Sequence, residues 1–187
     1  VWHRRMLQLL GWLAPRERWV LKAPSHLAAL DALLAVYPDA CIVQTHRDPL
    51  RVMGSVLSTL YATASIRCDR IDVDALRAGF SGESCATLLD AATRVRTSEI
   101  AKDARFVDVG YAELVRDPLV TIAGLYRELG IALSAEARSR MRDYLARKPK
   151  DKHGAHAYDF AETGVDRAGE RARFADYQRT YGVPSED

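Results

Sequence analysis

The chain is 187 residues long, 48% hydrophobic and 28% charged, with a formal net charge of +2. This length predicts one domain, residues 1–187, and the nearly balanced charge gives no global electrostatic argument for binding nucleic acid or a membrane surface. Three scattered cysteines (Cys41, Cys68 and Cys85) form no CxxC motif and cannot all pair with one another, which favours a reducing, cytoplasmic environment. No apolar run approaches the ~18 residues that a bilayer-spanning helix needs, so no membrane span is expected.

Short apolar strands alternate with helical patterns along the chain. In the first half of the chain, the pattern predicts a helix over residues 2–13, a strand over 18–22, a helix over 26–36, a strand over 40–45, a helix over 49–63 and a mixed helix and loop over 64–82. In the second half it predicts a helix over 83–102, a strand over 105–109, a turn at 111–117, helices over 118–128 and 134–147, a polar loop over 148–159 and a helix over 167–181. Ser25 is expected to cap the second helix. This alternation predicts an α/β fold with a parallel sheet.

Residues 41–55 form the most informative stretch, in which a strand stops at Arg47, turns through an Asp-Pro pair and opens a helix. Ser55 follows eight residues after Arg47, about two helical turns on. A guanidinium at the carboxyl end of a strand and a hydroxyl on the next helix can converge on one phosphate. The alternative is structural, with Arg47 paired to Asp48 or Asp39 and the serine satisfied within its helix.

A second segment, Trp19-Val-Leu-Lys-Ala-Pro-Ser-His26, places a lysine at the end of a predicted strand and a histidine shortly after it. Lys22 could neutralise charge on a phosphate or sulfate leaving group, and His26 lies within reach as a general base. The alternative is a surface lysine followed by a Ser-His pair that caps a helix.

Two further segments carry weaker signals. Tyr111 ends the third predicted strand, where an aromatic ring can flank an adenine, although a half-buried core tyrosine would give the same pattern. The loop 148–154 holds lysines and backbone amides that could close over a phosphate, and its alternative is a solvated charged loop.

Together these motifs resemble the sulfotransferase family that uses 3'-phosphoadenosine 5'-phosphosulfate (PAPS), particularly its bacterial branch. WVLKAPSHL, YPDACIVQTHRDPLRVMGS, GYAELVRDPL and HGAHAY…F..Y occur in that family's order and at near-family spacing, from about residue 17 to residue 181. The resemblance implies a P-loop-NTPase-like fold, a three-layer parallel sheet with helices on both faces. It also implies sulfuryl transfer from PAPS to a hydroxyl or amine, with no metal required.

The same resemblance implies a site around the 3'-phosphate of PAPS. Arg47 and Ser55 would bind that phosphate, and Lys152, His153 and Gly154 resemble the late Arg-Lys-Gly segment that folds over it. A lysine replaces the family's arginine there, and lysine is a poorer bidentate partner.

For the rest of the donor, the resemblance implies three roles. Lys22 looks like the strand-end lysine that stabilises the transferring sulfuryl group. His26 falls near the position of the catalytic base in cytosolic sulfotransferases, and Tyr111 matches an adenine-side tyrosine.

One departure from the family pattern stands out. The family opens with a strand, a glycine-containing loop such as PRSGTT and a helix, and the loop holds the 5'-phosphosulfate on backbone amides. No such sequence occurs in this chain, so the predicted sheet is incomplete. We therefore expect either the C-terminal part of a longer protein or a degenerate homologue, and the first residue, valine, favours the former. The chain alone is expected to bind PAPS weakly and turn over poorly.

Other classes of protein fit only parts of this sequence. A P-loop nucleotide kinase would need a Walker A motif, which is absent, and a magnesium-binding acid, for which Asp108 is the only candidate. A non-catalytic nucleotide- or nucleic-acid-binding domain would rest on seven basic residues within 138–152, but acidic residues interrupt that run, so no nucleic-acid partner is expected. A metal site at His153, His156 and Asp159 has nonspecific spacing. The acceptor, whether a small molecule, a glycan or a lipid, and the oligomeric state are not indicated by the sequence.

Overall fold

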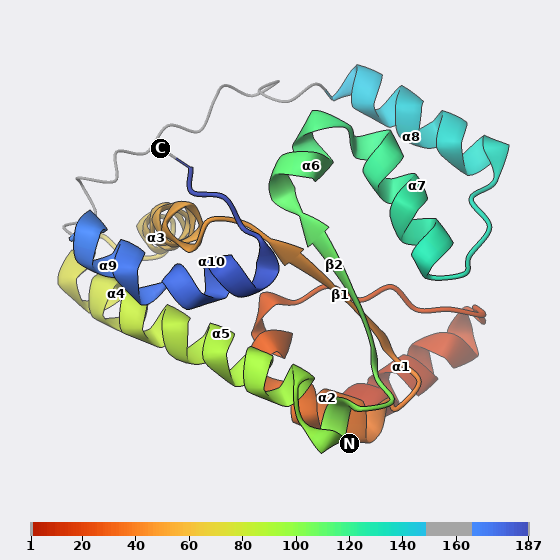
Figure 1. Cartoon of the computed structure of the whole chain (residues 1–187), viewed down its shortest axis with the longest axis horizontal. Helices are drawn as coiled ribbons and strands as arrows, with labels where there is room; N and C mark the ends of the chain where they lie inside the picture. The colour runs from red at the N-terminus through yellow and green to blue at the C-terminus, as the bar shows by residue number, and fades with distance from the viewer. Residues whose placement is uncertain (1, 149–165, 187) are drawn as a thin grey trace. The chain divides into compact units, whose positions relative to one another are not determined.

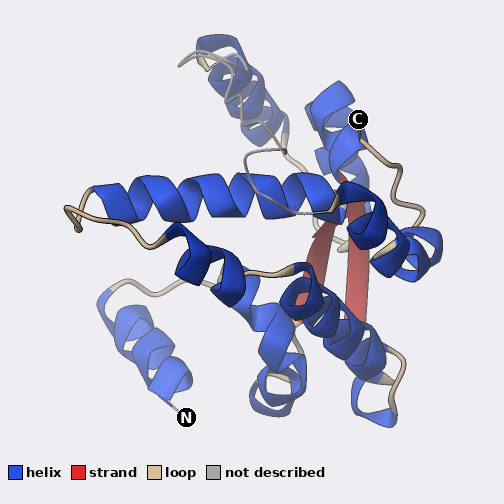
Figure 2. Ribbon diagram, turned by 90° about the vertical axis from the view of Figure 1, so that its left-hand side faces the viewer, coloured by secondary structure: helices blue, strands red, loops and turns tan. Residues whose placement is uncertain are grey.

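The computed structural model describes residues 2–148 and 166–186 (Figure 1). The chain divides into two compact units, the first made of Val1–Cys41 and Leu88–Arg105, the second of Ile42–Thr87 and Phe106–Asp187. The described residues are mostly helical, and their two strands pair side by side (Figure 2). Among these residues, none of the helices combines the length and the apolar character needed to cross a bilayer.

The first unit is built from short helices. It contains α1 (Trp2–Leu13), the 3-10 helix η1 (Pro24–Ala29), α2 (Leu30–Val36), most of α5 (Gly82–Arg96) and the 3-10 helix η2 (Glu99–Ala101). Its helix α2 packs against η1 and η2, and Leu30, Leu34 and Ala101 are buried there. The helix predicted over 83–102 is thus divided into α5 and η2.

Two predictions for this unit were wrong. Residues 18–22 form no strand, and Val20 is 96% exposed. A short apolar run becomes a strand only when a neighbouring strand satisfies its backbone groups, and no strand in the described part of the chain pairs with it. Ser25 lies inside η1 instead of capping it, because Pro24 already takes the first helical position and the cap is Ala23, which makes no side-chain bond.

The second unit contains the sheet. Strands β1 (Cys41–His46) and β2 (Arg105–Gly110) pair in a small two-stranded parallel sheet, which confirms the strands predicted over 40–45 and 105–109. Both lie next to one another in Figure 1. In β1 the polar Gln44 and His46 are buried while Val43 is 40% exposed, the reverse of the usual apolar-in pattern. The buried face of β1 therefore carries hydrogen-bonding groups.

Seven helices of this unit lie within its described residues. They are α3 (Pro49–Ser65), α4 (Val73–Gly79), α6 (Tyr111–Arg116), α7 (Pro118–Glu128), α8 (Ala135–Arg147), α9 (Arg167–Arg173) and α10 (Ala175–Tyr181). Helix α3 packs against α4 and α9, and α9 against α10. The predicted turn at 111–117 is instead helix α6. The helix predicted over 167–181 is broken at Phe174, the largest fully buried side chain among the described residues.

Candidate functional site

Local helix capping sets the turn between β1 and α3, residues 47–49, which we call the β1–α3 corner. Asp48 is the N-cap of α3, and its Oδ1 accepts a hydrogen bond from the backbone N–H of Leu50 at 3.0 Å. Pro49 occupies the first helical position, where its lack of an N–H costs nothing. The turn therefore fixes where the strand stops and holds Arg47 at the strand's carboxyl end.

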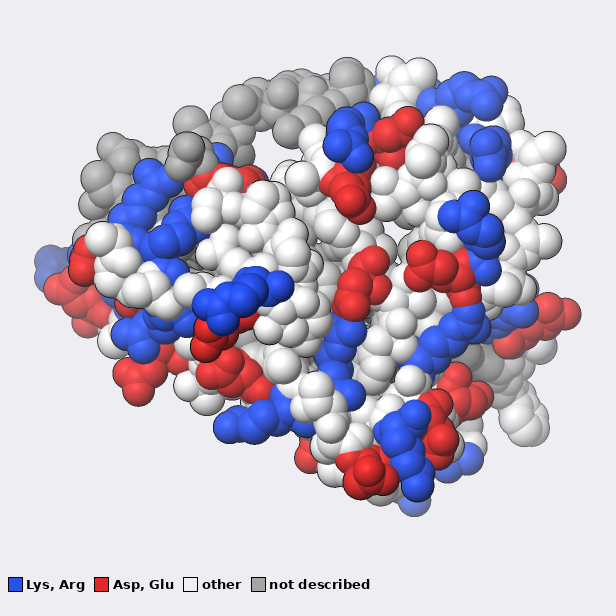
Figure 3. Space-filling view, viewed as in Figure 1, with Lys and Arg blue, Asp and Glu red and all other residues white. Residues whose placement is uncertain are grey.

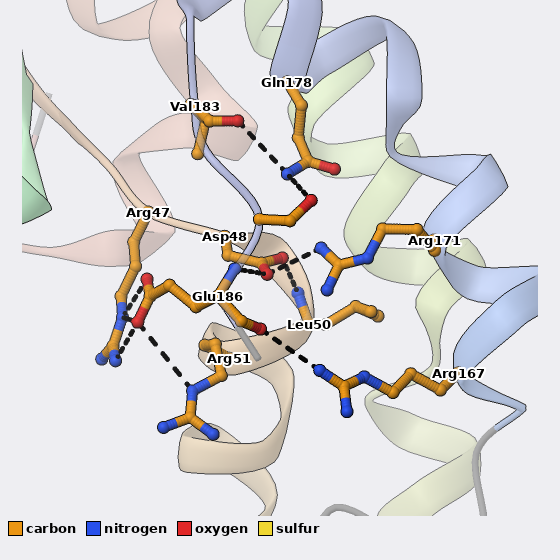
Figure 4. A network of polar contacts seen from close by, with 10 residues as sticks. Arg47, Asp48, Leu50, Arg51, Arg167, Arg171, Gln178, Val183 and Glu186 are labelled. Carbon is orange, nitrogen blue, oxygen red and sulfur yellow. Dashed lines mark hydrogen bonds and ion pairs between the residues drawn. The ribbon is translucent and has the colours of Figure 1, made fainter.

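Arg47 is held by a carboxylate and by an aromatic ring. Its Nε donates to Glu186 Oε1 at 2.9 Å, and its Nη2 donates to Oε2 of the same carboxylate at 2.7 Å. Its guanidinium carbon lies 4.1 Å from the centre of the Tyr111 ring, close enough for a cation–π interaction. The structure thus brings together two predicted site residues, Arg47 and Tyr111. It also gives Arg47 a partner that the sequence does not indicate, Glu186 (Figure 4).

An ion pair with a fully buried carboxylate connects the same corner to α9. The Asp48 side chain is 0% exposed, and its Oδ2 accepts from Arg171 Nη1 at 2.6 Å and from the backbone N–H of Glu186 at 2.7 Å. One carboxylate therefore caps α3, binds α9 and fixes the segment that carries Glu186. From the sequence, Asp48 is expected only as the turn residue before Pro49 or as a partner of Arg47.

His46 forms a second polar cluster on the sheet. Its Nε2 lies 2.7 Å from Asp108 Oδ1 and its Nδ1 lies 2.7 Å from the Tyr177 hydroxyl, while its ring stacks on Tyr181 at 4.4 Å. A carboxylate can only accept, so Nε2 carries the hydrogen that is donated to Asp108. The sequence pattern does not predict this cluster, although Tyr177 is the tyrosine of the F..Y motif.

The other predicted site residues are found in different settings. Ser55 is half-buried on α3, two turns from the corner, and its backbone carbonyl accepts from the Thr59 hydroxyl at 2.8 Å. In the first unit, Lys22 is exposed on an irregular segment, and His26 lies in η1 with its ring 6.0 Å from that of His3. Lys152, His153 and Gly154 lie outside the described residues, as do His156 and Asp159.

Charge on the described surface is mixed in sign. Lysine and arginine alternate with aspartate and glutamate on the face drawn in Figure 3. On α8, Arg140 pairs with Glu136 at 2.7 Å, so part of the basic run is neutralised within its own helix. Among the residues that the structure describes, no three His, Cys, Asp or Glu side chains gather in a metal-binding arrangement.

One titratable group near α9 has a shifted pKa. Burial, and secondly the negative charge of Glu170, raise the pKa of the Cys85 thiol from 9.0 to about 11. Both causes disfavour the thiolate. Cys85 is therefore a packing residue, whereas Cys41 and Cys68 are exposed.

Sequence comparison places the chain among bacterial sulfotransferases. The model of the Sulfotransferase family matches residues 2–135. The omega-hydroxy-beta-dihydromenaquinone-9 sulfotransferase Stf3 of Mycobacterium bovis is 26% identical over 152 residues, which cover 78% of this chain and 38% of that protein. Stf3 of Mycobacterium tuberculosis gives the same values.

Solved structures agree with this placement. The crystal structure of sulfotransferase STF9 from Mycobacterium avium matches with a TM-score of 0.80 and 30% identity, over 97% of this chain and 46% of that one. Sulfotransferase STF1 from Mycobacterium tuberculosis matches with a TM-score of 0.69 and 35% identity, over 93% of this chain and 44% of that one. The chain thus spans less than half the length of these relatives. The matches confirm the predicted α/β fold, and this chain belongs to the sulfotransferase family.

Proposed function

We propose that this chain supplies the 3'-phosphate half of a PAPS site, in a sulfotransferase that transfers a sulfuryl group to a hydroxyl or amine. The observation that carries the proposal is the fork of Arg47, which already holds the two oxygens of one anion at 2.7 and 2.9 Å. Arginine binds phosphate with the same two parallel hydrogen bonds. A guanidinium so placed, at the carboxyl end of a parallel strand, stands where ligands bind in α/β sheets.

Each residue then has a defined task. Arg47 and Ser55 bind the 3'-phosphate, and Tyr111, which lies under the guanidinium, flanks the adenine. Lys152, His153 and Gly154 close over the 3'-phosphate. Family membership and the predicted motifs support these tasks, together with the Arg47–Tyr111 contact.

The proposed reaction is an in-line displacement at sulfur. PAPS supplies the activated sulfuryl group, whose bond to the 5'-phosphate oxygen breaks as the acceptor's lone pair forms a new bond to sulfur. His26 is proposed to take the acceptor's proton, and Lys22 to neutralise the negative charge that develops on the leaving phosphate. None of these roles calls for a metal ion.

For the acceptor we propose an alcohol or amine, with a hydroxylated lipid as the first candidate to try. The name of the relative Stf3 gives an omega-hydroxy-dihydromenaquinone as its substrate. Small molecules and glycans are the alternatives to compare with it.

Calorimetry with adenosine 3',5'-bisphosphate and with adenosine 5'-monophosphate tests the donor site. The protein should bind the bisphosphate more tightly than the monophosphate. Arg47→Ala should weaken bisphosphate binding by about 30-fold or more, because two charge-assisted hydrogen bonds to the phosphate are lost. Lys22→Ala should leave bisphosphate binding nearly unchanged, since its proposed task arises during transfer. Arg140→Ala, which removes an arginine that also pairs with a glutamate, is the matched control. Equal binding of the two nucleotides, or an Arg47→Ala variant that binds like the wild type, would contradict the proposal.

A further inference from the structure

The segment that follows α10 returns to the β1–α3 corner by a defined path. Gly182 adopts a left-handed conformation (φ 63°), which lets the N–H of Val183 donate back to the Gln178 carbonyl at 2.8 Å. Val183 is buried, and its own carbonyl accepts from Gln178 Nε2 at 3.3 Å. The chain is therefore anchored before it reaches Glu186. We refer to residues 183–186 as the tail segment.

The carboxylate at the end of the tail segment lies among arginines. Arg47 holds both of its oxygens, and Arg51 Nε lies 3.9 Å from Oε2. Arg167 Nη2 donates to the backbone carbonyl of Glu186 at 3.3 Å. Figure 4 shows Glu186 between Arg47 and Arg51, with Asp48 beside its backbone. A phosphate oxyanion bound by arginines needs the same arrangement of guanidinium groups.

We propose that Glu186 is an intramolecular competitor for this anion site, and that a phosphate group binds between Arg47 and Arg51 when the carboxylate leaves. The inference rests on the proposed function, because it takes the 3'-phosphate of the donor as the incoming anion. It adds a ligand, Arg51, and an occupant, Glu186, to the residues inferred from the sequence.

The competing contact is one that can be exchanged. The side chains of Arg47 and Glu186 are 26% and 29% exposed, so water screens their attraction and can solvate the carboxylate once it is released. A phosphate with two negative charges interacts more strongly with two guanidinium groups than a single carboxylate does. The exchange is therefore favourable once the donor is present at sufficient concentration.

The carboxylate can leave without the tail segment unfolding. The backbone N–H of Glu186 is held separately by Asp48 Oδ2 at 2.7 Å, and Val183 stays buried. Because these contacts do not involve the carboxylate, the Glu186 side chain can move away from Arg47 while they stay in place. A substitution at Glu186 that keeps the backbone thus removes only the competitor.

Calorimetry with adenosine 3',5'-bisphosphate on Glu186→Gln measures the competition. The neutral amide should tighten binding by about three- to tenfold, because a larger fraction of the protein then has its anion site open. Arg51→Ala should weaken binding by a similar factor. Glu136→Gln, which removes a charge from an exposed arginine pair on α8, controls for the general loss of a negative charge and should leave binding unchanged.

The outcomes separate this inference from the proposed function. If Arg47→Ala weakens bisphosphate binding but Glu186→Gln binds no more tightly than Glu136→Gln, Glu186 does not compete for the anion site, while the proposed donor site at Arg47 is supported. If Arg51→Ala binds like the wild type, the phosphate does not lie between the two arginines. If Arg47→Ala binds like the wild type, the donor site itself is wrong. The competition is supported if Glu186→Gln binds the bisphosphate more tightly than the wild type while Glu136→Gln does not. High salt should reduce this difference in binding.

Discussion

The β1–α3 corner and the segment 18–26 both carry residues predicted to handle an anion, yet they are supported in opposite ways. At the corner, Asp48 is 1% exposed and three separate parts of the chain meet on its carboxylate. In the segment, Val20 is 96% exposed and Lys22 lies on irregular backbone. A cation that is fixed by its neighbours needs no further ordering to bind a phosphate once its carboxylate partner leaves, whereas one on an irregular exposed segment must first be ordered. The corner is therefore the preorganised part of the proposed site.

Replacing Asp48 should break this preorganisation with the largest effect on stability. Asp48→Asn keeps the shape but removes the charge that Arg171 faces, and it leaves fewer acceptors for the N–H groups of Leu50 and Glu186. We expect the free energy of unfolding to fall by about 2–4 kcal/mol, since a fully buried carboxylate loses its ion pair with the partly exposed Arg171 and part of its hydrogen bonding. Urea denaturation followed by circular dichroism measures the change.

Asp72→Asn is the matched control for this experiment. Asp72 caps α4 through a bond to the N–H of Ala75 at 2.9 Å but is exposed. Since asparagine is also a good cap, the control should lose less than about 0.5 kcal/mol. Equal losses for Asp48→Asn and Asp72→Asn would mean that the ion pair with Arg171 adds nothing to the stability beyond the helix cap.

Cys85 reports on how tightly α9, the helix that supplies Arg171, packs beside the corner. Its pKa is raised to about 11 in the folded protein, so the folded thiol keeps its proton between pH 9 and 11 while the unfolded thiol loses it. This contribution to stability is fully present below pH 9 and is lost as the pH rises towards 11. Across this window the free energy of unfolding of the wild type should fall more steeply than that of Cys85→Ala. Parallel pH profiles of the two proteins would show that the thiol is not protected.

Much of the corner could be predicted from local sequence. The Asp-Pro pair after Arg47 sets the end of β1 and the start of α3 because capping and proline geometry act within a few residues. The same locality explains why β2, α7 and α8 were predicted close to their observed bounds.

The partners within the site could not be predicted in this way. Arg47 and Glu186 are 139 residues apart, and Asp48 and Arg171 are 123 apart, so nothing in the local pattern selects one carboxylate or arginine from the many in the chain. Tyr177, which is 131 residues from His46, was marked only through a family motif. The strand predicted over 18–22 failed for a related reason, since an apolar run does not show whether a partner strand will pair with it.

Two serines provide the smallest test of the difference between the regions. Ser134 caps α8 through a bond from the N–H of Ala137 to its Oγ at 3.0 Å, whereas Ser25 lies inside η1 and caps nothing. Ser134→Ala should lower the free energy of unfolding by about 1 kcal/mol, because a backbone donor at the helix start loses its partner. Ser25→Ala should change it by less than about 0.5 kcal/mol, as expected for a surface substitution away from such features. A loss at Ser25 as large as that at Ser134 would mean that Ser25 does cap a helix, as the sequence had predicted, and that the segment 18–26 is more ordered than its exposure indicates.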